Sequence, residues 1–225
     1  MDAGWCGQGK EDLQMDRLAE IARSNQPELI IVDRMMGGRH ENYVTPERKI
    51  PALDEIPTKV WESNIPIGND WGYVPHDTFK STQELIETLI DVVSKGGNLI
   101  LGVGPTPEGT FTKEETQRLL ELGSWLERYG EGIYETRARP EAWEEDWRLT
   151  YSKDQKTHYA FRNITAHTKS KIFLKEIHAA EKALITDLAT GQPLTVYGAG
   201  ENAYIAASEV QQPPLGAVGI RVSTH

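Results

Sequence analysis

The 225-residue sequence has only one cysteine, Cys6. A single cysteine excludes an intramolecular disulfide and any metal site built from several thiolates, but it leaves the compartment open. Long apolar runs are missing as well, because no segment approaches the roughly 20 apolar residues of a transmembrane helix. Nothing ahead of Asp2 has the length of a signal peptide. Basic residues are also scarce, since 24 Lys and Arg face 34 Asp and Glu for a net charge of -10.

This negative charge disfavours two classes of partner. It repels phosphate backbones and anionic membrane surfaces, so we expect neither a nucleic acid nor a membrane as partner. The chain is long enough for one large domain or two smaller ones with an ordinary buried core. We therefore predict a soluble globular protein.

Helical and strand patterns alternate through the first part of the chain. Apolar residues recur at helical spacing in the segment 11–24, and the continuous apolar stretch 27–33 (PELIIVD) predicts a buried strand. Ser81 and Glu84 form a capping box at the start of a second helix.

The same alternation continues beyond the second helix. NLILGVGP predicts another buried strand, and Thr112 with Glu115 caps a third helix. Such alternation is typical of a parallel α/β sheet or barrel, whose functional residues gather in the loops after the C-terminal ends of the strands.

The pattern changes in the last third of the chain. Short β-rich segments replace the long helices: WRLTYS, THYAFRN, SKIFLKEI, KALITDLATGQPLTVYG, NAYIAAS and VGIRVS. DLATGQPLTV predicts a hairpin with Thr190 and Gly191 in its turn. We place the boundary within 138–145, with a partial α/β domain before it (1–140) and an antiparallel β-sandwich after it (141–225).

Six side chains stand where an α/β barrel gathers its site: the carboxylates Asp2, Glu47 and Glu62, the guanidinium of Arg34, and the indoles of Trp5 and Trp71. These are the ingredients of a carbohydrate site, because aromatic rings stack on the C–H faces of sugars while two carboxyls flank the bond to be cut. Ordinary interpretations stay open: solvated loop acids, core packing of Trp71, and an ion pair of Arg34 with Asp33 or Asp70.

Four longer strings are more specific than these single residues: VDRMMGGRHENYVTPE, WESNIPIGNDWGY, KGGNLILGVGPTPEGTF and LLELGSWLERYGEGIYETR. They resemble the α-L-fucosidases of glycoside hydrolase family 29, and the resemblance covers about residues 2–137. It implies an α/β fold, namely the C-terminal half of a (β/α)8-like (TIM) barrel followed by an antiparallel β-sandwich. It also implies retaining hydrolysis of terminal α-L-fucosyl residues from glycans, in a periplasmic or extracellular protein.

The resemblance gives the opening MDAGW a role. It is similar to the family's LDGGW segment, which places Asp2 at the position of the nucleophile that ends the fourth barrel strand. We therefore expect the chain to begin inside a barrel strand, without the half that supplies several sugar-binding residues. A truncated or mis-started reading frame, a split gene, or one part of a larger assembly are the alternatives.

The acid/base position varies within the family, and three glutamates compete for it. Glu47, in the TPE stretch, is the first choice; Glu62, in the Trp-Glu pair, is the second; Glu41 is a distant third. By the same resemblance Arg34 contacts the sugar near the nucleophile and Trp71 lines the fucose methyl group. Trp5, which is close to Asp2 in the sequence, is a further substrate-binding candidate.

Retaining chemistry sets opposite demands on the two carboxyls, which stand about 5–5.5 Å apart. The nucleophile Asp2 must be ionised, which a nearby Arg34 favours, whereas the general acid must hold a proton. Later the same acid group acts as the base that activates water.

We expect no cofactor and no metal. GGNLILGVGPTPEG lacks the Gly-Lys-Ser/Thr of a phosphate-binding loop and the G-x-G-x-x-G of a dinucleotide fold. His40, Glu41 and Asp33 match no recognised metal-ligand spacing.

Two other functions stay open at this point. A non-catalytic sugar-binding or partner-dependent fragment is one, because half a barrel exposes strand edges and apolar surface. A retaining glycosidase of another specificity on a related barrel is the other. The expected partners are a fucosylated glycan and either the missing N-terminal half or further copies of the chain.

Overall fold

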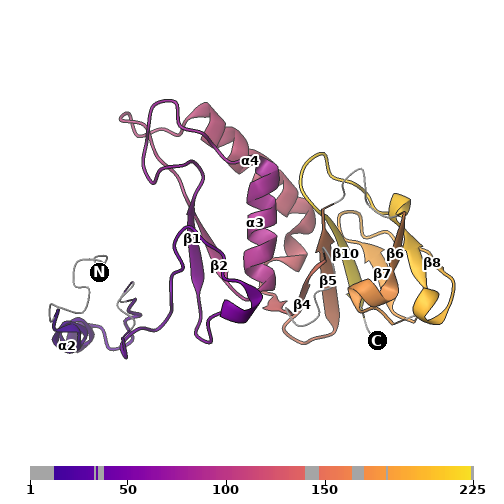
Figure 1. Ribbon diagram of the computed structural model, residues 1–225, viewed down its shortest axis with the longest axis horizontal. Helices are drawn as coiled ribbons and strands as arrows, with labels where there is room; N and C mark the ends of the chain where they lie inside the picture. Colours follow the sequence, from indigo (N-terminus) through magenta and orange to yellow (C-terminus); the bar gives the residue numbers. More distant parts are fainter. Residues whose placement is uncertain are drawn as a thin grey trace.

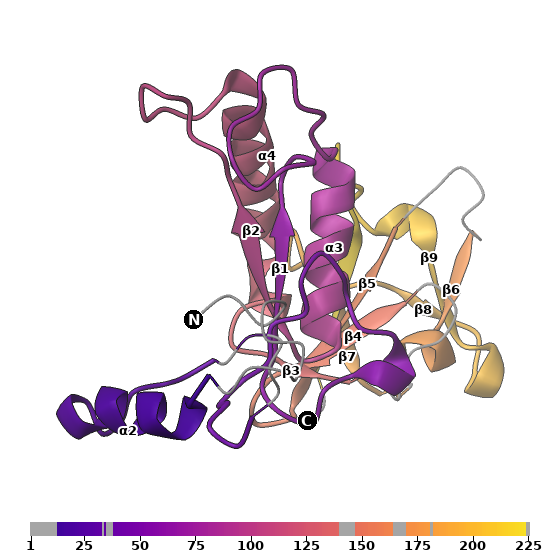
Figure 2. The same ribbon diagram turned by 60° about the vertical axis from the view of Figure 1, so that its left-hand side comes forward.

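The computed structural model describes residues 13–32, 34, 38–139, 147–163, 170–180 and 182–223. Helices α3 (Thr82–Ser94) and α4 (Lys113–Tyr129) stand between a parallel strand pair and a strand-rich C-terminal part (Figure 1). Helix α2 (Met15–Asn25) lies at the end of the molecule farthest from the C-terminal strands (Figure 1), and the turned view in Figure 2 also places it apart from α3 and α4.

Strands β1 (Glu62–Pro66) and β2 (Asn98–Gly102) pair in parallel. The segment 44–48 runs parallel to the other edge of β1, with bridges from Val44 to Trp61 and from Glu47 to Asn64. This arrangement confirms the predicted parallel α/β pattern in the first part of the chain.

The predicted helices are confirmed, including their caps. The Ser81 hydroxyl accepts the Glu84 N–H at the start of α3, and the Glu84 carboxylate accepts the Ser81 N–H in return. Thr112 and Glu115 make the same reciprocal contacts at the start of α4. A capping box satisfies two backbone donors at a helix end, which is why these short sequence patterns locate helix starts reliably.

The predicted strand at 27–33 is wrong. Residues 29–32 form no regular element, and Ile30 is 70% exposed. The Asn42 side chain accepts the Ile31 N–H at 2.8 Å in place of a neighbouring strand. The prediction of a buried strand at β2 is confirmed for the strand but not for the burial, because Ile100 is 42% exposed. An apolar run becomes a buried strand only where neighbours cover both of its faces.

The described residues of the C-terminal part form two antiparallel sheets. One contains, in spatial order, β3 (Arg137–Ala138), β4 (Arg148–Tyr151), β5 (Thr157–Arg162), β10 (Val218–Ser223) and β7 (Leu184–Asp187). The other contains β6 (Lys171–Phe173), β9 (Tyr204–Ala206) and β8 (Val196–Tyr197). The hairpin after β7 is confirmed, with Gly191 at a φ of +69°. The predicted boundary residues 140–145 lie outside the described residues. Short 3₁₀ helices occur at Leu53–Glu55, Gly130–Gly132, Leu174–Ile177, Gly200–Asn202 and Ala207–Glu209.

Among the described residues, two hydrophobic cores organise this architecture. The first contains side chains from both sheets, among them Trp147, Ile172, Ile205 and Ile220, as expected for a sandwich. The second joins α3 and α4 to β5 and the start of β10, and Trp125 is its centre: its ring stacks on Tyr129 at 5.0 Å and its indole N–H donates to the Ala217 carbonyl. Both helices are therefore packed on the C-terminal strands, and α3 also contacts β2.

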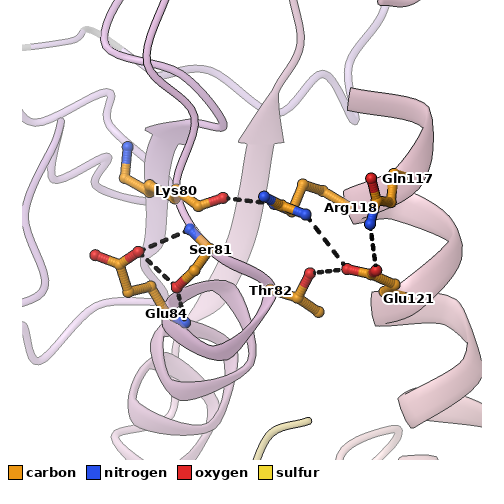
Figure 3. Close-up of polar contacts among 7 residues, drawn as sticks. All are labelled: Lys80, Ser81, Thr82, Glu84, Gln117, Arg118 and Glu121. Atoms are coloured by element: carbon orange, nitrogen blue, oxygen red, sulfur yellow. Dashed lines mark hydrogen bonds and ion pairs between the residues drawn. The ribbon is translucent and has the colours of Figure 1, made fainter. Parts of the chain in front are cut away.

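A polar cluster joins the start of α3 to α4 (Figure 3). Glu121 accepts hydrogen bonds from the Thr82 hydroxyl and from the Gln117 amide, the second at 2.8 Å. The Arg118 guanidinium donates to the Lys80 carbonyl at 3.0 Å. The pKa of Glu121 lies below the usual 4.5. The hydrogen bond from Thr82 is the main cause, and the hydrogen bond from Gln117 is the next. The cluster therefore favours the ionised carboxylate.

This pKa shift predicts a loss of stability in acid. A carboxyl whose pKa is lower in the folded state contributes stability above its unfolded pKa, and that contribution disappears as the pH falls through the folded value. We expect Glu121→Gln to lower the free energy of unfolding at pH 7 and to reduce its decrease below about pH 4.5. Urea unfolding at pH 7 and at a pH below about 4.5 measures both free energies. Glu127→Gln, on the exposed surface of α4, is the control. An unchanged pH dependence in Glu121→Gln contradicts the assignment.

Candidate active site

The parallel strands share one C-terminal edge. Segment 44–48, β1 and β2 run in the same direction, so the residues after each of them meet at that edge. The residues at this edge are Arg48, which ends its segment, and the loops 67–80 and 103–112, which follow β1 and β2. Functional groups of parallel α/β folds gather in such loops.

The sheet is covered on one face and exposed on the other. Glu47 is in register with Asn64, and Asn64 with Ile100, so these three residues share a face. The half-exposed Ile100 lies on it. Ser63 and Ile65, which alternate with Asn64 along β1, are buried on the opposite face. The face that carries Glu47 is therefore accessible.

Arg34 and Glu47 form an ion pair, with the Arg34 Nη2 donating to the Glu47 Oε2. The two side chains are 17% and 33% exposed, so the contact is partly shielded from water. The structure therefore brings together two of the predicted site residues, 13 positions apart in the sequence. Glu47 is thus one partner of Arg34, which the sequence patterns did not propose. Asp33, one of the two partners that the sequence left open, lies outside the described residues.

Glu62 occupies a different place. It is the first residue of β1, where its backbone N–H donates to the Val44 carbonyl. Asn64 is the residue of β1 in register with Glu47, and Glu62 lies two residues before it. Two residues span about 7 Å along a strand, so Glu62 is about 7 Å farther than Asn64 from the C-terminal edge. The structure does not bring Glu62 to that edge.

Trp71 lies in the loop that follows β1 and is 37% exposed, so it is not a core residue. The Arg48 guanidinium carbon stands 4.7 Å from the centroid of its ring. A Cβ atom on Gly102, at the end of β2, would lie 3.4 Å from two atoms of the same ring, so the indole packs against the end of β2. Trp71 therefore belongs to the same edge as Glu47.

Two charged side chains hold the loop that carries Trp71. The Asp77 carboxylate accepts the N–H groups of Asn69 and Asp70, at 3.0 and 3.3 Å. The Lys80 ammonium donates to the carbonyls of Pro66 and Gly68, at 2.7 and 3.1 Å. Burial is the main cause of a lowered Lys80 pKa.

The loop after β2 packs against the loop that carries Trp71. Glu115 is 1% exposed, and its carboxylate accepts the Gly104 N–H at 2.7 Å as well as the Thr112 N–H of the capping box. Gly104 touches the backbone of Gly72, because a Cβ added there would come within 2.6 Å of that chain. Gly104 in the GVGP string thus serves close backbone packing.

The remaining candidates fall in two groups. Asp2 and Trp5 lie outside the described residues, so their places stay predictions. Glu41 accepts a contact from Lys59, and His40 pairs with Asp16 at 2.7 Å. Within the described residues, no three His, Cys, Asp or Glu side chains gather as a metal site would require. No helix in that part of the chain is long and apolar enough to cross a membrane.

Sequence reasoning missed Arg48, Asp77 and Lys80. Arg48 directly follows Glu47 in the TPER string, which was the available signal, but the backbone turn there could not be anticipated. Its φ of +55° lies in the left-handed region, which glycine and asparagine favour over arginine.

The Arg34–Glu47 pair and Trp71 are residue types that carbohydrate sites of α/β proteins use, and they lie on parallel strands or in the loops beside them. Comparisons with known proteins are more specific. The family model described as α-L-fucosidase matches residues 1–131. The chain belongs to the α-L-fucosidase family.

Individual relatives agree with this membership. The plasma α-L-fucosidase of Rattus norvegicus is 30% identical over 165 residues, which are 70% of this chain and 36% of the relative. The human plasma enzyme is 35% identical over 102 residues, 44% of this chain and 22% of the relative. The chain thus spans about a third or less of these curated relatives.

Solved structures extend the similarity to the β-rich part. The α-fucosidase of Thermotoga maritima has a TM-score of 0.70 and 27% identity, and covers 93% of this chain with 49% of its own length. Isoenzyme 1 of Paenibacillus thiaminolyticus has a TM-score of 0.79 over 93% of this chain and 53% of its own, at 24% identity, which supports the fold alone.

Proposed function

We propose that this chain is the C-terminal part of a retaining α-L-fucosidase that removes terminal α-L-fucosyl residues from glycans. The observation that carries the proposal is the Arg34–Glu47 pair on the accessible face of the parallel strands, within the segment that the family model matches. A Thermotoga maritima relative, 25% identical, is described in complex with fucose, which supports fucose as the sugar.

The proposed architecture is half of a (β/α)8 barrel followed by a β-sandwich. Three features support it: the strands are parallel, helices α3 and α4 lie on one side of them, and the other face is partly exposed. In a closed barrel that other face becomes the packed interior. The remaining strands come from residues outside these 225 or from a partner chain, and the domain boundary stays at 140/141.

In the proposed reaction the Asp2 carboxylate attacks the anomeric carbon while Glu47 protonates the departing glycosidic oxygen. The bond between fucose and aglycone breaks, and a fucosyl ester of Asp2 forms. Glu47, now ionised, then takes a proton from water as the water oxygen displaces Asp2 and releases fucose. Asp2 is unchanged at the end.

Glu47 is preferred over Glu62 as acid/base because it lies nearer the C-terminal edge of the strands. Arg34 is proposed to bind the sugar or Asp2 in the complete site. Trp71 offers part of its ring to the sugar, and Trp5 is proposed as a second contact. The reaction as written needs no cofactor and no metal.

Hydrolysis of aryl glycosides tests the proposal. The chain is assayed alone and with an N-terminal barrel half from a full-length relative, against aryl α-L-fucoside and aryl galactosides. We expect hydrolysis of the fucoside, with the supplied half raising the rate. Hydrolysis of galactosides alone would identify another glycosidase. Fucose binding without hydrolysis, both by the chain alone and with the supplied half, would favour a sugar-binding fragment. Size-exclusion chromatography of the same samples shows whether copies of the chain associate.

A further inference from the structure

Arg48 links two residues of the candidate site that come from different segments. Its backbone follows Glu47 directly, and its N–H donates to the Asn64 carbonyl of β1 at 2.9 Å. Its side chain reaches the loop after β1, where Nη1 donates to the Asn69 carbonyl at 2.7 Å and the guanidinium lies over Trp71. One residue therefore touches the strand, the loop and the indole.

The backbone of Arg48 is held in an unfavourable conformation. Its φ of +55° lies in the left-handed region, where a non-glycine residue is disfavoured. Such a conformation persists where surrounding contacts determine it. Here the bonds to Asn64 and Asn69 and the contact with Trp71 provide those contacts.

Several hydrogen bonds hold the loop that carries Trp71. The Asn69 and Asp70 amides bind Asp77, Lys80 binds two carbonyls of the same loop, and the Lys80 carbonyl is fixed by Arg118 on α4 (Figure 3). The Trp71 loop is thus attached to the helices through Lys80. The Arg48 side chain joins this loop to the Glu47 segment.

We propose that Arg48 is a positioning residue that fixes Trp71 relative to Glu47 and so preorganises the sugar site. A guanidinium is suited to this role because it can stack on an indole and donate in its own plane to a carbonyl at the same time. Lysine supplies the charge without the planar fork. This inference rests on the proposed function, because it assigns the preorganised surface to a sugar.

Hydrogen exchange of the Asn69 and Asp70 amides tests the linkage in the full chain. Arg48→Met keeps the aliphatic stem and removes the guanidinium, and we expect it to raise both exchange rates about tenfold. Arg48→Lys should restore part of the protection. Arg128→Met, at an exposed position on α4, is the matched control and should change neither rate. Amides in the middle of α3 report global stability and should also be unchanged.

Two results would overturn the role of Arg48: unchanged Asn69 and Asp70 exchange in Arg48→Met, or an equal increase in α3. A parallel titration with L-fucose keeps the proposed function distinguishable. We expect fucose to slow exchange at Asn69 and Asp70 in the wild type and to bind Arg48→Met about fivefold more weakly. If fucose has no effect on the wild type, sugar binding by this chain fails, and the variant comparison alone decides whether Arg48 holds the loop.

Discussion

Glu47→Gln is expected to lower the rate of fucoside hydrolysis by about 10²- to 10⁴-fold, the usual contribution of a positioned general acid. The amide has nearly the same shape as the carboxyl and retains an acceptor for Arg34, so packing is preserved while the transferable proton is lost. The rate is measured with an N-terminal barrel half supplied. The loss should be largest for a fucoside with a poor leaving group and smaller for an activated aryl fucoside, whose oxygen needs less protonation.

Glu62→Gln is the matched control for this experiment. Both residues are glutamates on or beside the same parallel strands, but Glu62 begins β1 and Glu47 is in register with Asn64, nearer its end. We expect Glu62→Gln to change the rate little and to show no dependence on the leaving group. The opposite outcome, with the leaving-group effect in Glu62→Gln, would reassign the acid/base and leave Glu47 as a partner of Arg34.

Local sequence patterns predicted the helical part of the fold well. The capping boxes at Ser81 and Thr112 depend on residues only three positions apart, so the sequence contains all the information that they need. The β-rich tail was also predictable, because turns such as that at Gly191 have a strong local preference.

Burial and side-chain contacts between distant segments were not predictable from these patterns. The apolar run at 27–33 reads as a strand, but its pairing depends on neighbours that periodicity does not describe, and Ile30 is mostly exposed. The contact between Arg34 and Glu47 was not predicted, since no spacing rule joins residues 13 apart outside a helix, and the family resemblance only assigned both residues to one site. The contacts of Arg48 were not predicted, because they depend on a left-handed backbone conformation that arginine rarely adopts.

The central claim is that the Asp2 carboxylate is the nucleophile. Replacing it with alanine removes the group that forms the fucosyl ester, so we expect Asp2→Ala to lose activity on the order of 10⁴-fold or more. Urea unfolding shows whether the Asp2→Ala variant still folds, and we expect a free energy of unfolding close to that of the wild type. A loss of activity with retained stability then points to chemistry.

Mass spectrometry after treatment with 2-fluoro-fucosyl fluoride tests this claim most directly. The fluorine at C2 slows hydrolysis of the fucosyl ester, so the intermediate accumulates on the residue that attacked. With the barrel half supplied, the account predicts one 2-fluoro-fucosyl group on the wild-type peptide that contains Asp2, and none on that of Asp2→Ala. Labelling of another carboxylate, or full activity of Asp2→Ala, would contradict it.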